Sequence, residues 1–152
     1  MTEQHEPCLI CERVRVWRSG QNPYFIHEFE HSIFVIGDHQ FHRGYSLILL
    51  KTHIRELHEL PPPIQSALFQ EVMLAGQAIV NTFNPWKMNY ACYGNSEPHI
   101  HWHLFPRYES DGDRQGVPWL HASEFKHHLI TPQTAQNLGQ KVREHLSLLI
   151  TR

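Results

Sequence analysis

PHIHWHLFPR, residues 98–107, places a histidine at every second position of a short apolar segment. Successive side chains of a β-strand point to opposite faces, so the three imidazoles are expected on one face, repeated roughly every 7 Å. The other face is apolar throughout and suits packing beneath a helix. The histidines are His99, His101 and His103, and the residues that alternate with them are Ile100, Trp102 and Leu104.

The alternating histidines admit three interpretations. The segment is an exposed strand that happens to be rich in histidine, or two or three imidazoles on it bind a metal such as zinc. In the third interpretation one neutral imidazole attacks phosphorus while its neighbours position the phosphate. The strict alternation and the apolar opposite face disfavour the first interpretation and leave the other two open.

Length and composition indicate a globular protein of one domain, residues 1–152. Apolar residues make up 41% of the 152, enough for a hydrophobic core without disulfide bonds. The 13 Lys and Arg against 15 Asp and Glu give a formal net charge of -2, whereas proteins that coat nucleic acid are usually clearly basic. The 14 histidines are unusual, because histidine binds metals, transfers protons and attacks phosphorus.

The N-terminal stretch MTEQHEPCLICERV, residues 1–14, is polar and acidic and has no apolar signal core. No later run is long enough to span a bilayer. We therefore expect a soluble cytoplasmic protein without a membrane partner. In that reducing compartment the three cysteines, Cys8, Cys11 and Cys92, are expected as free thiols and not as a disulfide.

Apolar patterning predicts an α+β domain with a mainly antiparallel sheet. An apolar residue recurs every three or four positions after the Pro61–Pro63 run, which is typical of an amphipathic helix that Asn84-Pro85 ends. A second helix fits 132–150, and the polar, glycine-bearing residues 108–117 read as a flexible loop. The predicted strands are a hairpin over 24–38 and single strands over 44–51, 87–93 and 99–107.

Two segments resemble the histidine triad (HIT) family. HIHWHLF, residues 99–105, matches the family pattern His-φ-His-φ-His-φ-φ, in which φ is apolar, residue for residue. GYSLILLKTHIRELHEL, residues 44–60, is similar to the segment upstream of the triad. YGNSEPHIHWHLFPRY, residues 93–108, looks especially like bacterial members described as dinucleoside-polyphosphate hydrolases. The sequence departs from the family pattern at Tyr45, where a histidine is usual, at Leu50, where a proline is usual, and in GNSEP, which replaces Gly-Gly-Gln.

The resemblance covers about residues 8–110 and implies a HIT-like fold. That fold has about five strands in a mainly antiparallel sheet, with one long helix packed on it and a C-terminal helix. Residues 111–152 would then form a C-terminal extension of the core at 8–110. The resemblance also implies a homodimer, whereas the expectation of no nucleic-acid partner rests on the charge balance.

The resemblance assigns roles in a nucleotide hydrolase or transferase. His101 would attack the α-phosphorus of a nucleoside polyphosphate, dinucleoside polyphosphate or phosphoramidate and form a nucleotidyl-histidine intermediate, which water hydrolyses. His103 would donate to a phosphate oxygen or to the leaving group. Ser96 matches a phosphate-contacting position, and Asn95 is its neighbour. Asp38 matches a position that holds the ribose hydroxyls, although a turn-forming Asp is an equally good interpretation of the sequence.

CLIC, residues 8–11, is a Cys-x-x-Cys whose spacing fits two thiolate ligands on one turn. By itself the motif also suits a redox pair or two idle thiols, and a structural zinc site needs four ligands. The resemblance supplies the other two, a histidine after the upstream lysine segment and the first triad histidine. It implies a structural Zn²⁺ bound by Cys8, Cys11, His53 and His99, with no organic cofactor.

Three alternatives to a hydrolase follow from the same residues. They are a nucleotide-binding regulator with little turnover, a nucleotidyl transferase or phosphorylase, and a zinc-stabilised structural module. Arg107 either meets a phosphate or is the solvated end of a strand. In some members of the family the C-terminal segment reaches a partner's active site, so the resemblance implies that VPW, residues 117–119, would touch substrate.

Overall fold

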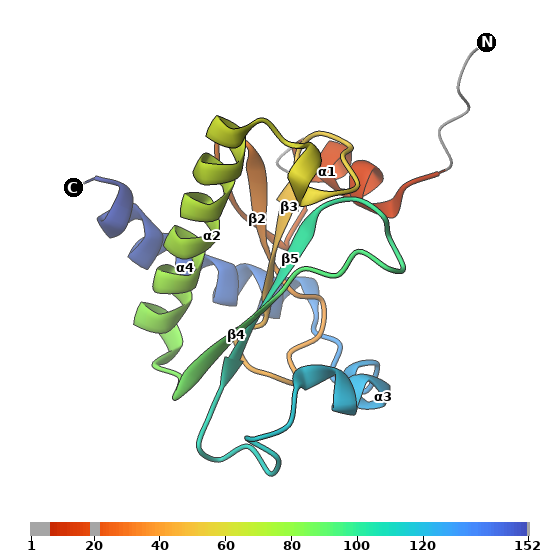
Figure 1. Ribbon diagram of the computed structural model, residues 1–152. Helices are drawn as coiled ribbons and strands as arrows, with labels where there is room; N and C mark the ends of the chain where they lie inside the picture. Colours follow the sequence, from red (N-terminus) through yellow and green to blue (C-terminus); the bar gives the residue numbers. More distant parts are fainter. Residues whose placement is uncertain (1–6, 19–21, 152) are drawn as a thin grey trace.

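The computed structural model describes residues 7–18 and 22–151 and centres on a five-stranded antiparallel sheet (Figure 1). The strand order is β1-β2-β3-β5-β4, so β1 and β4 form the edges. The strands are β1 (Phe25–Glu28), β2 (Ser32–Ile36), β3 (Ser46–Leu50), β4 (Lys87–Ala91) and β5 (His101–Arg107). Residues 1–6, which begin the stretch expected to lack a signal core, lie outside the described residues.

The helices of the described chain are α1 (Leu9–Arg18), α2 (Pro62–Phe83), α3 (Ala122–Phe125) and α4 (Pro132–Ile150), with short 3-10 turns η1 (Leu57–Glu59) and η2 (Pro118–His121). α2 begins at a proline, whose missing N–H does no harm in a first turn. It ends at Asn84, which adopts a left-handed conformation with φ 49°. None of these helices is long and apolar enough to cross a membrane. The predicted α+β fold, with its long helix and C-terminal helix, is confirmed.

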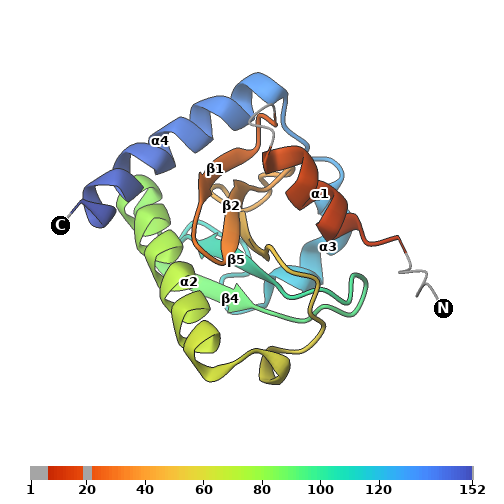
Figure 2. The ribbon, with the colours of Figure 1, turned by 90° about the horizontal axis from the view of Figure 1, so that it is seen from above.

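One face of the sheet is covered by α2 and α4 (Figure 2). Alternation along β2 turns Phe34 and Ile36 to this face, and Val72 and Ile79 of α2 pack against them without any exposure. Burying an aliphatic or aromatic side chain fully contributes roughly 1.5–3 kcal/mol. α4 adds Ala135, Val142 and Leu146 to the same core, so the segment expected as an extension packs into the main hydrophobic core.

The opposite face is covered by α1 and α3 (Figure 2). α1 buries Ile10, Val14 and Trp17 against residues of β2 and β3, including Ile33 and Leu49. α1 was not predicted from the sequence. The steps of four and three between its buried residues were nevertheless a helical signal, partly hidden because the Cys-x-x-Cys motif overlaps its first turn.

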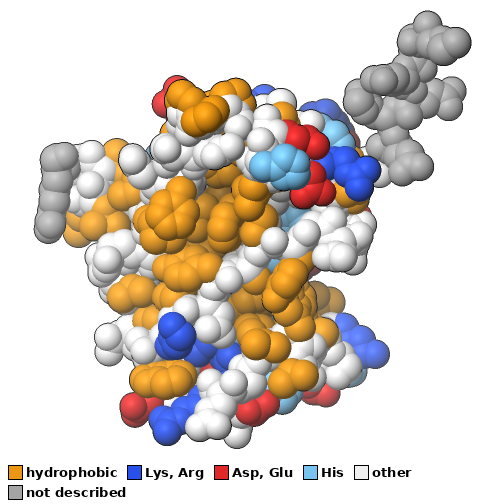
Figure 3. Space-filling model, in the orientation of Figure 1, with side chains coloured by type: hydrophobic (Ala, Val, Ile, Leu, Met, Phe, Trp, Pro, Cys, Tyr) orange, Lys and Arg blue, Asp and Glu red, His pale blue; other side chains and the backbone are white. Residues whose placement is uncertain are grey.

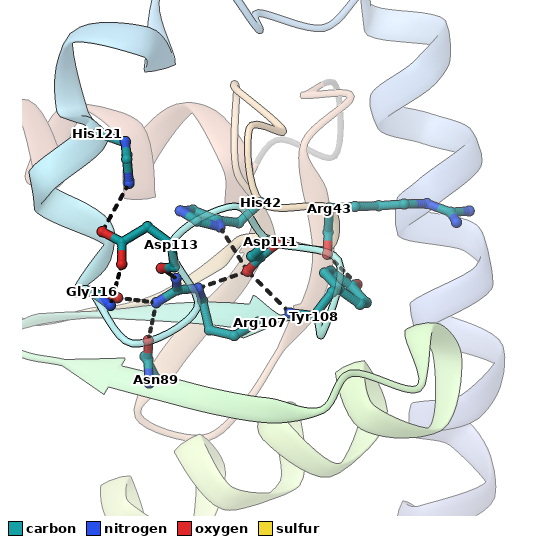
Figure 4. Close-up of polar contacts among 9 residues, drawn as sticks. All are labelled: His42, Arg43, Asn89, Arg107, Tyr108, Asp111, Asp113, Gly116 and His121. Atoms are coloured by element: carbon teal, nitrogen blue, oxygen red, sulfur yellow. Dashed lines mark hydrogen bonds and ion pairs between the residues drawn. The ribbon is translucent and has the colours of Figure 1, made fainter.

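Arg107, the last residue of β5, organises the loop that follows it (Figure 4). Its side chain is only 2% exposed. The guanidinium donates hydrogen bonds of 2.6–3.0 Å to the side chains of Asp111 and Asn89 and to the backbone oxygens of Asp113 and Gly116. Both interpretations of Arg107 from the sequence, a solvated strand end and a phosphate contact, are therefore wrong. The loop expected to be flexible is tied to one buried cation.

Candidate functional site

A cavity of about 510 Å³ opens on the face of the sheet that carries α1 and α3. All the residues that the sequence analysis assigned to catalysis and substrate binding line it: Asp38, Asn95, Ser96, His101 and His103. They come from three separate parts of the chain: the turn after β2, the loop between β4 and β5, and β5 itself. β3 and β5 are paired in register, Leu47 opposite His103 and Leu49 opposite His101, which fixes where the two imidazoles stand.

The ring of His101 is held by a backbone carbonyl. His101 is 7% exposed, and its Nδ1 lies 2.7 Å from the carbonyl oxygen of His99. A carbonyl oxygen can only accept, so Nδ1 carries the hydrogen and donates it. In the neutral ring the lone pair is therefore on Nε2. A neutral imidazole with a free lone pair is the form that attacks phosphorus.

His103 stands next to His101, with ring centroids 5.0 Å apart. Its Nδ1 lies 2.7 Å from the hydroxyl of Tyr45, and the indole of Trp119 meets its ring edge-on at 4.8 Å. Burial, and then the neighbouring imidazoles of His101 and His39, lower the pKa of His103 to about 3. The ring is thus neutral at physiological pH.

The other predicted substrate residues line the same cavity in more open positions. Asn95 and Ser96 lie on the exposed loop that precedes the histidines. The carboxylate of Asp38 is half-buried and faces Arg13 of α1 at 3.9 Å. The backbone N–H of Leu9 donates to Glu97 at 3.3 Å, which joins the start of α1 to the loop that carries Ser96.

His99 does not extend the histidine strand, because β5 begins at His101. The backbone leaves the regular ladder where β3 ends: Leu50 N–H donates to Ile100 at 3.1 Å, and Ile100 N–H donates to Ile54 at 2.9 Å. The prediction of a strand through all three histidines is wrong for His99. Its side chain instead turns toward the cysteines at the start of α1.

The four predicted metal ligands come together as one cluster. Their ligand atoms all lie within 4.8 Å of one another. The individual separations are 3.5 Å for Cys8 Sγ to His99 Nδ1, 3.4 Å for Cys11 Sγ to His99 Nδ1, 3.3 Å for Cys11 Sγ to His53 Nδ1 and 3.2 Å between the two Nδ1 atoms. Tetrahedral Cys and His ligands of zinc, with bonds of about 2.3 and 2.0–2.1 Å, stand roughly 3.3–3.8 Å apart. The cluster therefore fits a four-coordinate metal ion.

Contacts around the cluster prepare its donor atoms. Nε2 of His99 donates to the carbonyl oxygen of Leu50 at 2.7 Å, which leaves the Nδ1 lone pair directed at the thiols. Burial and the adjacent thiol of Cys8 raise the pKa of Cys11 to about 11. Two neighbouring thiolates at this site would therefore need a cation, which a metal ion would supply. The carbonyl oxygen of the same His99 accepts the hydrogen bond from Nδ1 of His101. The predicted metal ligand and the predicted nucleophile therefore lie on one short segment.

Several cavity residues were not assigned roles by the sequence analysis. Arg13 and Glu97 had no motif to mark them, and Arg13 reaches the cavity only because α1 exists. Tyr45 was noted only as a departure from a pattern. Trp119 belongs to the VPW stretch, and it reaches the cavity from η2 of its own chain.

The model of the HIT domain family matches residues 20–110, more than half of the chain and all of the histidine strand. The chain belongs to the HIT family. HIT proteins bind nucleotides, and the family includes nucleotide hydrolases.

Curated relatives extend this HIT match over nearly the whole chain. "Protein hit" of Bacillus subtilis is 28% identical over 149 residues, which cover 93% of this chain and 96% of the relative. The adenylylsulfatase HINT3 of Arabidopsis thaliana is 30% identical over 148 residues, covering 93% of this chain and 71% of the relative.

Solved structures show the same fold as this HIT chain. A Zn-bound histidine triad protein from Mycobacterium smegmatis superimposes with a TM-score of 0.68 at 22% identity, covering 95% of this chain and 96% of that one. A HIT protein from Bacillus subtilis gives a TM-score of 0.62 at 26% identity, over 91% and 96% of the two chains.

Proposed function

We propose that this protein is a nucleotide hydrolase that cleaves the bond between the α-phosphorus of a nucleotide and its leaving group. One observation carries the proposal: two imidazoles, His101 and His103, stand side by side in a cavity. Nδ1 of His101 is committed to the carbonyl of His99, so its Nε2 has the lone pair that a nucleophile needs.

The reaction proceeds in two displacements. Nε2 of His101 attacks the α-phosphorus, the P–O or P–N bond to the leaving group breaks, and its electron pair departs with the leaving group. A departing amine also takes up a proton from solvent. His103 donates a hydrogen bond to the oxygen where negative charge grows, and Asn95 and Ser96 donate to the remaining phosphate oxygens. Water then attacks the phosphorus of the nucleotidyl-histidine. The N–P bond breaks, neutral His101 is regenerated, and the proton of the water passes to solvent.

The substrate class follows from the leaving group that the site accepts. We propose dinucleoside polyphosphates first, on the likeness of residues 93–108, with nucleoside polyphosphates and phosphoramidates as variants. Asp38 would accept from the ribose hydroxyls once it releases Arg13. The name of the Arabidopsis relative adds adenylyl sulfate, in which the same α-phosphorus is attacked and sulfate departs.

We propose that the metal is Zn²⁺, bound by Cys8, Cys11, His53 and His99. A set of two thiolates and two imidazoles at tetrahedral spacing is the donor set that zinc prefers. Bound zinc supplies a structural cross-link between α1 and the segment before β5. Unpaired thiols at this site suit a reducing compartment such as the cytoplasm.

We propose further that the chain forms a homodimer through the β4 edge and the adjoining surface of α2. β4 is an edge strand, and edge strands offer unpaired backbone groups to a second copy. Apolar side chains gather on this side of the molecule (Figure 3). Those that are well exposed on α2, on β4 or just before β4 are Phe69, Met73, Trp86 and Tyr90, at 56%, 37%, 47% and 40%.

The function is tested by a hydrolysis panel with the wild type, His101→Ala and His127→Ala. The panel contains dinucleoside polyphosphates, adenosine phosphoramidate, adenylyl sulfate and nucleoside diphosphates. We expect mononucleotide release by the wild type, and a loss on the order of a thousandfold or more in His101→Ala, because no other group in the cavity replaces the nucleophile. His127 is exposed and away from the cavity, so His127→Ala should retain activity.

The same panel exposes the alternatives. A wild type that binds mononucleotide tightly but releases none would be a nucleotide-binding regulator. A wild type that needs phosphate or a second nucleotide as acceptor would be a phosphorylase or transferase. Trapping of the labelled nucleotide on His101 under acid-free quench conditions separates a mechanism through a nucleotidyl-histidine from one in which water attacks directly.

A further inference from the structure

The hydroxyl of Tyr45 forms a hydrogen bond with one of the three histidines. Within the described residues its recorded hydrogen-bond partner is Nδ1 of His103, at 2.7 Å. Tyr45 lies on the segment that enters β3, whereas His103 lies on the neighbouring strand β5. The contact therefore joins the segment before β3 to strand β5 in the lining of the cavity. It depends on a residue that replaces the usual histidine of the family pattern.

In the hydrogen bond between Tyr45 and His103, one group donates the hydrogen and the other accepts it. Tyr45 is 4% exposed, and burial raises the pKa of its phenol far above the usual value, so the hydroxyl keeps its hydrogen. Burial likewise keeps His103 neutral, with a pKa of about 3. A buried hydroxyl donates to an available acceptor, and the acceptor within reach is the nitrogen of His103. Nδ1 of His103 is then the accepting nitrogen, and its ring hydrogen is on Nε2.

The tautomer of His103 is thus opposite to that of His101. His101 donates from Nδ1 to the carbonyl of His99 and keeps its lone pair on Nε2. His103 accepts at Nδ1 from Tyr45 and keeps its hydrogen on Nε2. The lone pair of His101 is thus available for attack and the N–H of His103 is available for donation, although both are histidines on the same strand.

The position of Tyr45 is fixed by its surroundings. Its ring stacks on that of Phe105, with the ring centroids 4.3 Å apart and an interplanar angle of 7°. It also stacks on the ring of His39, with a centroid distance of 4.5 Å and an interplanar angle of 25°. Gly37 leaves room for it: a Cβ at that residue would lie 2.3 Å from Cδ1 of Tyr45. The hydroxyl therefore cannot turn away from His103 by a simple ring movement.

We propose that Tyr45 is a positioning residue that holds His103 in its Nε2–H tautomer, so that His103 donates to the oxygen of the phosphate or leaving group. The proposal rests on the proposed function for the identity of that oxygen. The tautomer itself is a property of the resting protein and can be measured without substrate.

The test uses the full-length chain labelled with nitrogen-15 histidine and compares wild type, Tyr45→Phe and Tyr108→Phe by long-range proton–nitrogen NMR. His103→Gln identifies the signals of His103. In the wild type we expect Nε2 of His103 to be protonated and Nδ1 to be bare. In Tyr45→Phe we expect the hydrogen to move in part to Nδ1, and kcat to fall about tenfold with little change in KM, as loss of one neutral hydrogen bond predicts.

Tyr108→Phe is the matched control, because it removes a tyrosine hydroxyl that donates at 2.6 Å to the backbone oxygen of Arg43. It should leave the His103 signals and kcat unchanged. A wild type in which Nδ1 of His103 carries the hydrogen overturns the proposal, even if Tyr45→Phe fails to fold. So does a folded Tyr45→Phe with unchanged tautomer and kcat. If the wild type cleaves no nucleotide, the proposed function fails, and the NMR signals still decide the tautomer.

Discussion

His42 shows at the scale of one residue how burial keeps a histidine of this chain neutral. The side chain is 3% exposed, and its Nδ1 lies 3.9 Å from the carboxylate of Asp111 (Figure 4). Nε2 has no partner within the described residues. Burial, and then the positive charge of Arg107, lower the pKa of His42 to about 4, and Asp111 offsets only part of this.

The depressed pKa of His42 predicts a loss of stability in mild acid. An unfolded histidine titrates near 6.5, so between about pH 6.5 and 4 the unfolded chain binds a proton that folded His42 does not. The stability contributed by neutral His42 is therefore complete above about pH 6.5 and declines as the pH falls toward 4. Each such group steepens the decline by up to about 1.4 kcal/mol per pH unit.

This loss is measured by urea unfolding of the wild type and His42→Gln from pH 7 to 4.5. The slope of unfolding free energy against pH should be shallower in the variant, and that slope, not the absolute stability, is the readout. His127→Gln, at an exposed position, is the control and should retain the wild-type slope. Equal slopes in all three proteins would contradict the prediction.

α1 is the element that joins the Cys/His cluster to the cavity. Its first turn carries Cys11, its buried face packs on the sheet through Val14 and Trp17, and Arg13 lines the cavity. The contact from Leu9 to Glu97 adds a second tie to the loop before β5. A change at the metal ligands is therefore expected to reach the substrate pocket through the position of this helix.

Removal of one ligand tests that connection. We expect Cys11→Ser to lower bound zinc well below one ion per chain and the unfolding free energy by roughly 3 kcal/mol or more, because loss of a metal site is among the most destabilising changes. Nucleotide binding should weaken as well, because α1 forms part of the cavity. Metal analysis and urea unfolding, with and without a chelator, measure the first two effects, and calorimetry measures the third.

Cys92→Ser is the matched control, because Cys92 is a half-buried thiol that packs against the main core away from the cluster. It should retain zinc and its response to the chelator. A Cys11→Ser protein with full zinc content, or a wild type whose stability does not respond to chelation, would remove the structural role assigned to the metal.

At the scale of the whole molecule, the two faces of the sheet differ in what they leave exposed. The face with α1 and α3 carries the Cys/His cluster, the aromatic stack around Tyr45 and the candidate cavity. The side with α2 and the β4 edge leaves Phe69 and Tyr90 open to solvent (Figure 3). Tyr90 lies over Gly76 of α2, where a Cβ would meet its hydroxyl at 2.3 Å, so strand and helix present one continuous surface.

If this surface is the proposed dimer interface, a charged side chain within it should prevent the two copies from associating. We expect the wild type to scatter light as a dimer at micromolar concentration and Met73→Glu to scatter as a monomer, because burying an unpaired carboxylate in an apolar interface is unfavourable by several kcal/mol. Leu148→Glu, at a 63% exposed position on α4, is the control and should remain dimeric. A monomeric wild type, or a dimeric Met73→Glu, would exclude this interface.

The sequence by itself determined what depends on neighbours a few residues apart. Period-two alternation placed His101 and His103 on one face of a strand, and three- and four-residue steps gave the buried stripe of α2. The Cys/His cluster was also predicted, from a resemblance to a known family and not from spacing alone. These features could be predicted because each depends on a local repeat or a short motif.

Only the tertiary structure decided the contacts between distant residues. The hydrogen bond from Tyr45 to His103 spans 58 positions, and the approach of Cys11 to His99 spans 88. Both depend on the pairing register of β3 with β5 and on the packing of α1, which no local pattern specifies. The burial of Arg107 follows from the same cause, because a strand end is solvated or enclosed according to which loop folds over it.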